Sequence, residues 1–198
     1  MNTTRTRKLA AGATALITVL LVALVAGCGG DGDGDTASSS GTDRAFTSDM
    51  IPHHKSAVIM AKTAKERSKR PEIQKLADEI IRAQDSEIAQ MQAIDKRLAD
   101  AGKKRGKLGG GAMMGMGNEA SLKTAEPFDR AFIDMMIPHH QSAVEMSRIE
   151  LAKGEDDETK KLATAIIAAQ AKEIEQMNSY RKAWFGSASP SGGVPAEK

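Results

Sequence analysis

The 198-residue sequence predicts an all-α protein in which two repeated helical hairpins close into an antiparallel four-helix bundle. The main observation is an internal repeat: the segment from Phe46 to His54 recurs as the segment from Phe132 to His140, and the offset of 86 residues then holds without a gap. Within each repeat, apolar residues recur in steps of three and four, which is the period of one helix face. Because neither hairpin can bury such a face alone, we expect the two to pack on each other.

The first helix of each repeat is predicted to run from an aspartate through a proline and a pair of histidines. Its buried face is Asp43, Phe46, Met50, His53, Ala57, Met60 and Ala64 in repeat one, and Asp129, Phe132, Met136, His139, Ala143, Met146 and Glu150 in repeat two. This face crosses Pro52 and Pro138, and a proline inside a helix removes one backbone hydrogen bond and kinks it. The alternative is a helix that starts near Asp49 or Asp134 and holds the proline in its first turn.

The second helix of each repeat also shows one continuous face, and in repeat one it can begin at Pro71. The face is Ile73, Ala77, Ile80, Gln84, Glu87, Met91, Ile94 and Leu98 in repeat one, and Thr159, Ala163, Ile166, Gln170, Glu173, Met177, Tyr180 and Trp184 in repeat two. We therefore place repeat one at residues 43–101 and repeat two at residues 122–185. The Gly-rich crossover, 102–121, should be a mobile loop. The Gly/Ser/Pro-rich end, 186–198, predicts a disordered tail.

Residues 1–28 are typical of a bacterial lipoprotein signal peptide. Basic residues open the segment, residues 9–27 are uncharged and mostly apolar, and small residues precede Cys28, the one cysteine of the chain. Cys28 would then carry the lipid that anchors the protein to the outside of the cell membrane, in the periplasm, and no thiol would remain for a disulfide or a metal site. The alternative is a transmembrane anchor, for which the apolar stretch is long enough. Residues 29–42 predict a flexible tether.

The charge of the chain argues against a nucleic-acid binder. The formal net charge is +2, and three basic residues lie in the signal, so the rest of the chain carries about −1. A protein that binds nucleic acid would present a basic surface. Aromatic residues make up only 3% of the sequence, so we expect a core built largely from Ile, Leu, Ala and Met.

All four histidines and six of the eleven methionines occupy matched positions of the two repeats. The candidate metal ligands are Met50, His53, His54, Met60 and Met91 in repeat one, and Met136, His139, His140, Met146 and Met177 in repeat two. The polar residues expected to hold these ligands in place are Asp43, Gln84, Glu87, Asp129, Gln170 and Glu173. Buried polar groups need partners, so we expect a layer in which an imidazole binds metal and a Gln or Glu holds its other ring nitrogen. The alternatives are an ordinary hydrogen-bonded histidine network and methionines that only fill the core.

Helix geometry limits how the histidines can point. Neighbouring residues are about 100° apart on a helix of about 3.6 residues per turn, so His53 and His54 cannot both face the bundle axis. We expect His53 and His139 to point inward, and His54 and His140 to point toward a neighbouring helix or the rim. Met50 precedes His53 by three residues and His54 by four, so either pair can bind one ion from one helix face.

Methionine and histidine together favour copper. Thioether sulfur is a soft ligand that prefers Cu(I), whereas imidazole binds Cu(I), Cu(II) and zinc, so zinc alone would not select methionine. Iron in a helical bundle would use Glu-x-x-His motifs, and the sequence has none. Met113, Met114 and Met116 in the crossover would add flexible thioethers, which suit a docking or copper-transfer segment.

The motif Met-Ile-Pro-His-His, followed by Ala-Val-x-Met, occurs at residues 50–60 and again at residues 136–146. With the Asp and Phe that precede it, this duplicated pattern resembles the domain of unknown function 305 family, which includes CopM-like periplasmic copper-binding proteins. The resemblance covers about residues 43–185. It implies a ferritin-like bundle, export from the cytoplasm, and copper binding through the Met and His residues named above. It implies no particular reaction.

We therefore expect a lipid-anchored, extracytoplasmic copper-binding protein that buffers or stores copper, or hands it to a transfer protein, without enzymatic activity. Two other classes remain open. One is a metal-independent helical module that binds a partner at the cell surface, and the other is a bundle oxidase that cycles its bound metal. Metal content of the purified protein tests the former, and turnover of Cu(I) with oxygen tests the latter.

Overall fold

The computed structural model describes residues 41–108 and 118–196. These residues form four α helices and a short 3₁₀ helix, in the order α1 (Thr42–Arg67), α2 (Pro71–Asp100), η2 (Glu119–Lys123), α3 (Phe128–Lys153) and α4 (Asp157–Phe185). The predicted all-α four-helix bundle is confirmed. Within the two described ranges, no helix is both long and apolar enough to cross a membrane. The predicted signal segment with Cys28, most of the predicted tether, and Met113, Met114 and Met116 lie outside these ranges.

The helices begin and end where local chemistry allows. Helices α1 and α3 each continue through their internal proline, Pro52 and Pro138, so the prediction of one continuous helix is confirmed. Helix α2 starts at Pro71, a residue that suits a first turn because the backbone N–H it lacks would have no partner there. Helix α4 is capped by Asp156, whose carboxylate accepts the Thr159 N–H at 2.9 Å, and it ends at Gly186 with a φ of 83°.

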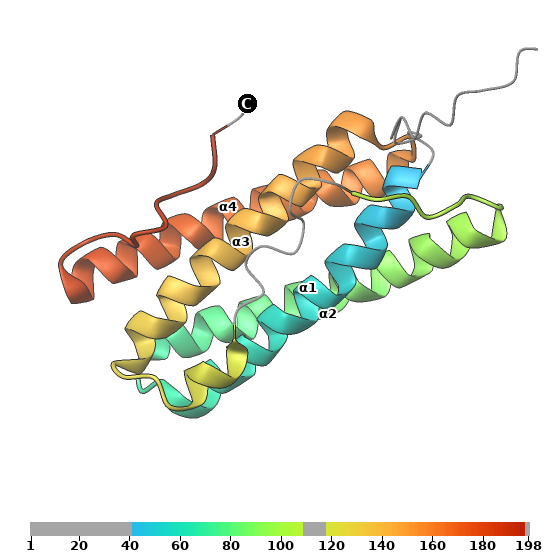
Figure 1. Ribbon diagram of the computed structural model, residues 1–198. Coiled ribbons are helices and arrows are strands. Elements are labelled where there is room, and N and C mark those ends of the chain that lie inside the picture. The colour runs from blue at the N-terminus through green and yellow to red at the C-terminus, as the bar shows by residue number, and fades with distance from the viewer. Residues whose placement is uncertain (1–40, 109–117, 197–198) are drawn as a thin grey trace, which may run out of the picture. The chain divides into compact units, whose positions relative to one another are not determined.

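Two antiparallel hairpins make the bundle. Helix α1 packs along α2 and α3 along α4, while α1 and α3 run in opposite directions and join the hairpins; α2 and α4 contact each other less (Figure 1). The buried apolar residues form two clusters. One contains Met60, Phe132, Met136 and Met177, and the other contains Phe46, Met50, Met91 and Met146. Each cluster therefore draws residues from both repeats, as expected of hairpins that cannot bury their faces separately.

The described ends of the crossover pack against the helices, unlike the mobile loop predicted for the whole of residues 102–121. The Gly106 N–H donates to the Gly41 carbonyl at 2.9 Å, which also places the last two residues of the predicted tether in the folded bundle. Leu108 is 3% exposed and joins the cluster around Phe46, and Leu122 of η2 is fully buried. Burial of these leucines stabilises the two ends, and glycine content alone did not reveal it.

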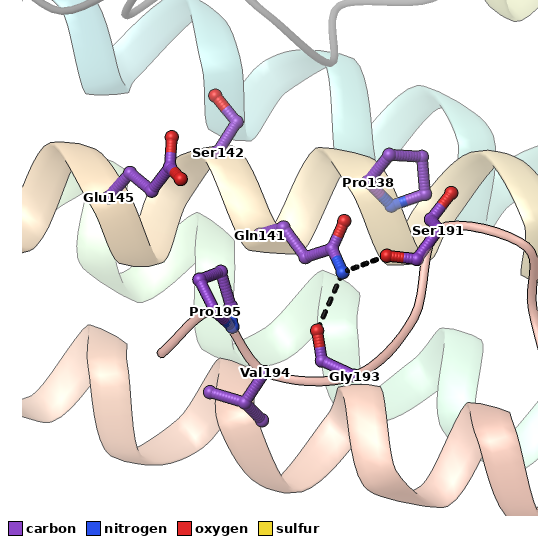
Figure 2. A pocket seen from close by; sticks show the side chains of 8 residues that line it. All are labelled: Pro138, Gln141, Ser142, Glu145, Ser191, Gly193, Val194 and Pro195. Atoms are coloured by element: carbon purple, nitrogen blue, oxygen red, sulfur yellow. Dashed lines mark hydrogen bonds between the residues drawn. The ribbon is translucent and has the colours of Figure 1, made fainter. Parts of the chain in front are cut away.

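The C-terminal segment 187–196 is not the disordered tail that its composition predicted. It folds back over α3, where the Gln141 amide donates to the carbonyls of Ser191 at 2.8 Å and Gly193 at 2.6 Å (Figure 2). Arg148 donates to the Pro195 and Ala196 carbonyls, both at 2.8 Å, and Val194 packs against the core. Side chains on α3 thus satisfy the backbone of a segment that forms no regular structure.

Candidate metal centre

The four histidines meet in one buried layer at the middle of the bundle. His53 on α1 and His139 on α3 face each other across the two repeats, with ring centroids 3.7 Å apart and an angle of 35° between the rings. The rings of His53 and His54 are 6.3 Å apart, and those of His139 and His140 are 6.2 Å apart. None of the four side chains is more than 1% exposed. The inward direction expected for His53 and His139 is what the structure has.

The other two histidines point toward the second helix of their own hairpin. The His54 Nε2 atom lies 2.8 Å from Glu87 Oε2 on α2, and the His140 Nε2 atom lies 2.7 Å from Glu173 Oε2 on α4. Of the two directions expected for these residues, the structure therefore has the neighbouring helix rather than the exposed rim. A carboxylate that accepts the Nε2–H proton leaves Nδ1 with its lone pair. Glu87 and Glu173 thus hold His54 and His140, whereas the prediction did not specify which ring each would hold.

Burial keeps the central rings neutral. Desolvation, followed by the neighbouring histidines His54 and His140, lowers the pKa of His53 to about 3. Desolvation, followed by the neighbouring histidines His53, His140 and His54, lowers the pKa of His139 well below its ordinary value. A neutral imidazole offers a nitrogen lone pair to a metal ion, and an imidazolium does not.

The layer holds many polar atoms that have no protein partner. Both ring nitrogens of His53, the Nδ1 atom of His54 and both amide atoms of Gln84 are buried without a hydrogen bond, and the same atoms of His139, His140 and Gln170 repeat this pattern. Buried polar groups without partners are rare in proteins and are costly when they occur. Of the Gln or Glu predicted to hold a ring nitrogen, Glu87 and Glu173 do so. The amides of Gln84 and Gln170 contact no ring nitrogen at hydrogen-bonding distance.

The six matched methionines flank this layer as two trios. Met50, Met91 and Met146 belong to one core cluster, and Met60, Met136 and Met177 belong to the other. Every one of them is at most 1% exposed. The 86-residue offset converts one trio into the other, and each trio takes one methionine from the opposite repeat. Packing in the core and metal ligation both require burial, so burial alone does not choose between them.

The donor set of the layer suits a soft ion. Among residues 41–108 and 118–196, no group of three or more His, Cys, Asp or Glu side chains is arranged to hold a metal ion. The donors brought together at mid-bundle are imidazole nitrogens and, on either side, thioether sulfurs. Neutral rings with free lone pairs fit copper, which accepts both donor types.

The structure does not bring Asp43 and Asp129 to the histidines. Asp43 is ten residues before His53 on α1, about 15 Å along a helix that rises about 1.5 Å per residue. Its Oδ1 atom accepts the N–H groups of Glu155 at 3.0 Å and Asp156 at 2.9 Å, so it caps the turn between α3 and α4. Asp129, at the other end of the bundle, pairs with Arg70 at 3.3 Å.

Glu150 is a buried titratable group that the sequence reasoning did not single out. It is 0% exposed and lies beside Asp43 and against Gly154, where a side chain would collide with its carboxyl group. Burial, followed by the neighbouring Asp43 carboxylate, raises the pKa of Glu150 to about 8. The signal in the sequence was a Glu in a buried stripe where repeat one has Ala64.

Comparison with known proteins agrees with this architecture. CopM in its Cu(I)-bound form is 37% identical, with a TM-score of 0.63 over 73% of this chain and 98% of CopM. A DUF305 fragment from Deinococcus radiodurans is 31% identical, with a TM-score of 0.59 over 70% of this chain and 94% of the fragment. A DUF305 protein from Streptomyces coelicolor has a TM-score of 0.65 over 76% of this chain and 98% of its own, at 22% identity, which shows the fold alone.

Sequence comparison gives the family. The uncharacterized protein L153 of Acanthamoeba polyphaga mimivirus is 43% identical over 51 residues, which is 26% of this chain and 34% of that protein. The chain thus matches about a third of the length of this relative. The profile of the family described as Domain of unknown function (DUF305) matches residues 43–181, the whole of the repeated bundle up to the last turn of α4. The chain therefore belongs to the DUF305 family.

Proposed function

We propose that this protein binds copper through the histidine layer and the methionine trios, and that it buffers, stores or hands over copper outside the cytoplasm. The role is binding rather than catalysis. Cu(I) is the favoured ion because thioether sulfur prefers it, and Cu(II) is accommodated by imidazole.

The observation that carries the proposal is the set of buried ring nitrogens with no protein partner. His53 and His139 together present four such atoms at the centre of the bundle, and the thioether trios lie on either side. A metal ion would satisfy these atoms and would offset the desolvation of the rings. Further support comes from CopM, a 36–37% identical relative known in Cu(I)-, Cu(II)- and Ag-bound forms.

The test is an anaerobic Cu(I) titration against a chromophoric competing chelator, with Cu(II) run in parallel. Met50→Leu combined with Met136→Leu nearly conserves volume, so the fold should lose less than about 1.5 kcal/mol per site. Cu(I) affinity should fall while Cu(II) affinity changes little, because thioether contributes mainly to Cu(I) binding. Unchanged Cu(I) affinity would assign both methionines to core packing, and equal weakening of both ions would indicate a disturbed bundle.

The number of sites follows from a second variant. The two halves are near-equivalent, and the His53–His139 contact places one residue of each half at the shared centre. If each half binds its own ion, His53→Ala with His54→Ala should remove about half of the bound copper. Loss of all copper would indicate one shared site on the pseudo-twofold axis, and retention of all copper would refute histidine ligation.

We also propose that Cys28 is lipidated and that the lipid anchors the protein to the outer face of the cell membrane. The support is the basic, apolar and small-residue order of residues 1–28. The Cys28→Ser variant should accumulate as uncleaved precursor, seen as a larger band in membrane fractions. A variant that is cleaved and released normally would identify an ordinary signal peptide instead.

A further inference from the structure

The buried layer contacts solvent through only two of its side chains. The histidines and the amides Gln84 and Gln170 are at most 2% exposed, as are the six methionines. The side chains of Glu87 and Glu173 are 13% and 15% exposed, and each also contacts a buried histidine, His54 or His140. Any ion that reaches the layer must pass from water into this interior, and Glu87 and Glu173 are polar groups that contact both the buried histidines and solvent.

A groove opens beside one of them. It lies between α2 and α4, where the two hairpins are in looser contact, and has a volume of about 240 Å³. Its lining is Glu87, Gln90, Ile94, Glu158, Lys161, Leu162 and Ala165. Ile94 and Leu162 belong to the same core cluster as Met50, Met91 and Met146. The groove is thus lined by Glu87, which contacts His54, and by two residues of the core cluster that contains one methionine trio.

We propose that Glu87 and Glu173 are the ports through which a soft cation enters and leaves the histidine–methionine interior, and that the α2–α4 groove is the mouth of the Glu87 port. This inference rests on the proposed copper binding. A carboxylate at the mouth attracts a cation. As the ion passes inward, the carboxylate exchanges its hydrogen bond to the imidazole for contact with the ion. Each port serves the half of the bundle that holds its own histidine.

The charges around the mouth indicate how entry can be tuned. Glu158 is not free, because it pairs with Arg97 at 3.0 Å. Among the described residues that line the groove, Lys161 is the one cation, and it lies on the exposed side of α4. A positive charge at the mouth opposes the approach of a cation, and this opposition is screened by salt.

The first experiment closes the mouth without touching a proposed ligand. Ala165 is exposed and lines the groove, so Ala165→Phe should fill it, and Ala168→Phe is the matched control on the same helix outside the lining. Protein is mixed rapidly with Cu(I) and quenched with excess chromophoric chelator at set delays. Ala165→Phe should slow uptake of half or all of the bound copper, and should slow release by the same factor. Equilibrium affinity should not change, because a barrier on the path affects both directions equally.

The second experiment changes the charge. Lys161→Glu should raise the uptake rate up to about tenfold at low salt, and the gain should vanish near 1 M salt. Lys62→Glu, an equal charge change on the exposed side of α1, is the control and should have little effect.

The outcomes separate the inference from its premise. Uptake rates unchanged in both Ala165→Phe and Lys161→Glu would overturn the port while leaving copper binding intact. Absence of bound copper in the unmodified protein at equilibrium would instead refute the proposed function.

Discussion

In the histidine layer the two repeats contribute the same side chains with the same partners, whereas at the ends of the bundle equivalent residues have different partners. His54 meets Glu87 and His140 meets Glu173, at 2.8 and 2.7 Å. By contrast, Asp43 caps the α3–α4 turn beside a buried Glu150, while Asp129 pairs with half-exposed Arg70 in an end where Ala64 takes the place of Glu150.

The difference between the layer and the ends indicates which matched residues folding requires. The ends show that this bundle forms with unlike residues at equivalent positions. Folding alone therefore does not demand two identical copies of a layer that leaves ring nitrogens and amides without partners. Such a layer opposes stability, since each unsatisfied buried group costs about 1–3 kcal/mol. We infer that the symmetry of the layer reflects what it binds.

The sharpest test replaces both central histidines with leucine. His53→Leu with His139→Leu should weaken Cu(I) binding by more than the roughly 10–100-fold typical of losing a residue that only supports a ligand. The metal-free bundle should become more stable, by about 1–3 kcal/mol, because buried polar atoms without partners are removed. Chelator competition and urea denaturation measure the two effects. A destabilised metal-free variant would show that the layer serves folding, and would contradict the inference that its symmetry reflects what it binds.

The second prediction concerns the end that holds Glu150. Because its pKa is raised to about 8 in the folded protein, against 4.5 ordinarily, its contribution to stability is full below pH 4.5 and declines until it is lost above pH 8. The expected slope is up to about 1.4 kcal/mol per pH unit in this window. The facing groups are Asp43 on α1, Asp156 in the turn and Lys160 on α4.

Glu150→Gln should flatten this pH dependence, and urea denaturation between pH 5 and pH 9 measures it. Glu150→Ala, which copies Ala64 of the other repeat, should flatten it as well. Copper affinity should stay unchanged in both variants, because Glu150 is remote from the layer. A slope that persists in both would assign the titration to another group.

The smallest effects separate the two aspartates. Asp43→Ala removes an acceptor of two backbone N–H groups and should destabilise the protein by about 1–2 kcal/mol, as loss of a helix cap does. Asp129→Ala removes a partly exposed ion pair and should change stability by less than about 1 kcal/mol. Thermal or urea unfolding measures both. Equal effects would mean that the two ends are more alike than their contacts indicate.

Much of the fold was predictable because each repeat shows an unbroken helical period. The spacing of apolar residues by three and four predicted that α1 and α3 continue through Pro52 and Pro138, as the structure has them. The packed ends of the crossover and the C-terminal segment were not predictable. Their order depends on contacts with distant side chains, such as Gln141 with Ser191, and composition does not encode such contacts.

For the site, the sequence predicted the direction of the histidine side chains but not the distances between them. The angle between consecutive residues placed His53 inward and left two directions for His54, a neighbouring helix or the rim. Helix geometry could not show that the ring centroids of His53 and His139 lie 3.7 Å apart, because that distance depends on how the hairpins pack. A matched aspartate on a helix face suggested a role beside the histidines for Asp43, but about three helical turns separate the two, and its partners come from the opposite hairpin.

The contact between His53 and His139 also bears on how the site depends on protein concentration. Two identical hairpins on separate chains, related by a true twofold axis, could present the same face to each other, as symmetric homodimers do. Such a dimer would dissociate on dilution and would release any ion bound between its halves. Joining the halves in one chain replaces that encounter with an intramolecular one, so the chance of the halves meeting no longer depends on the concentration of the protein. The duplicated chain can therefore keep its centre assembled however scarce the protein is.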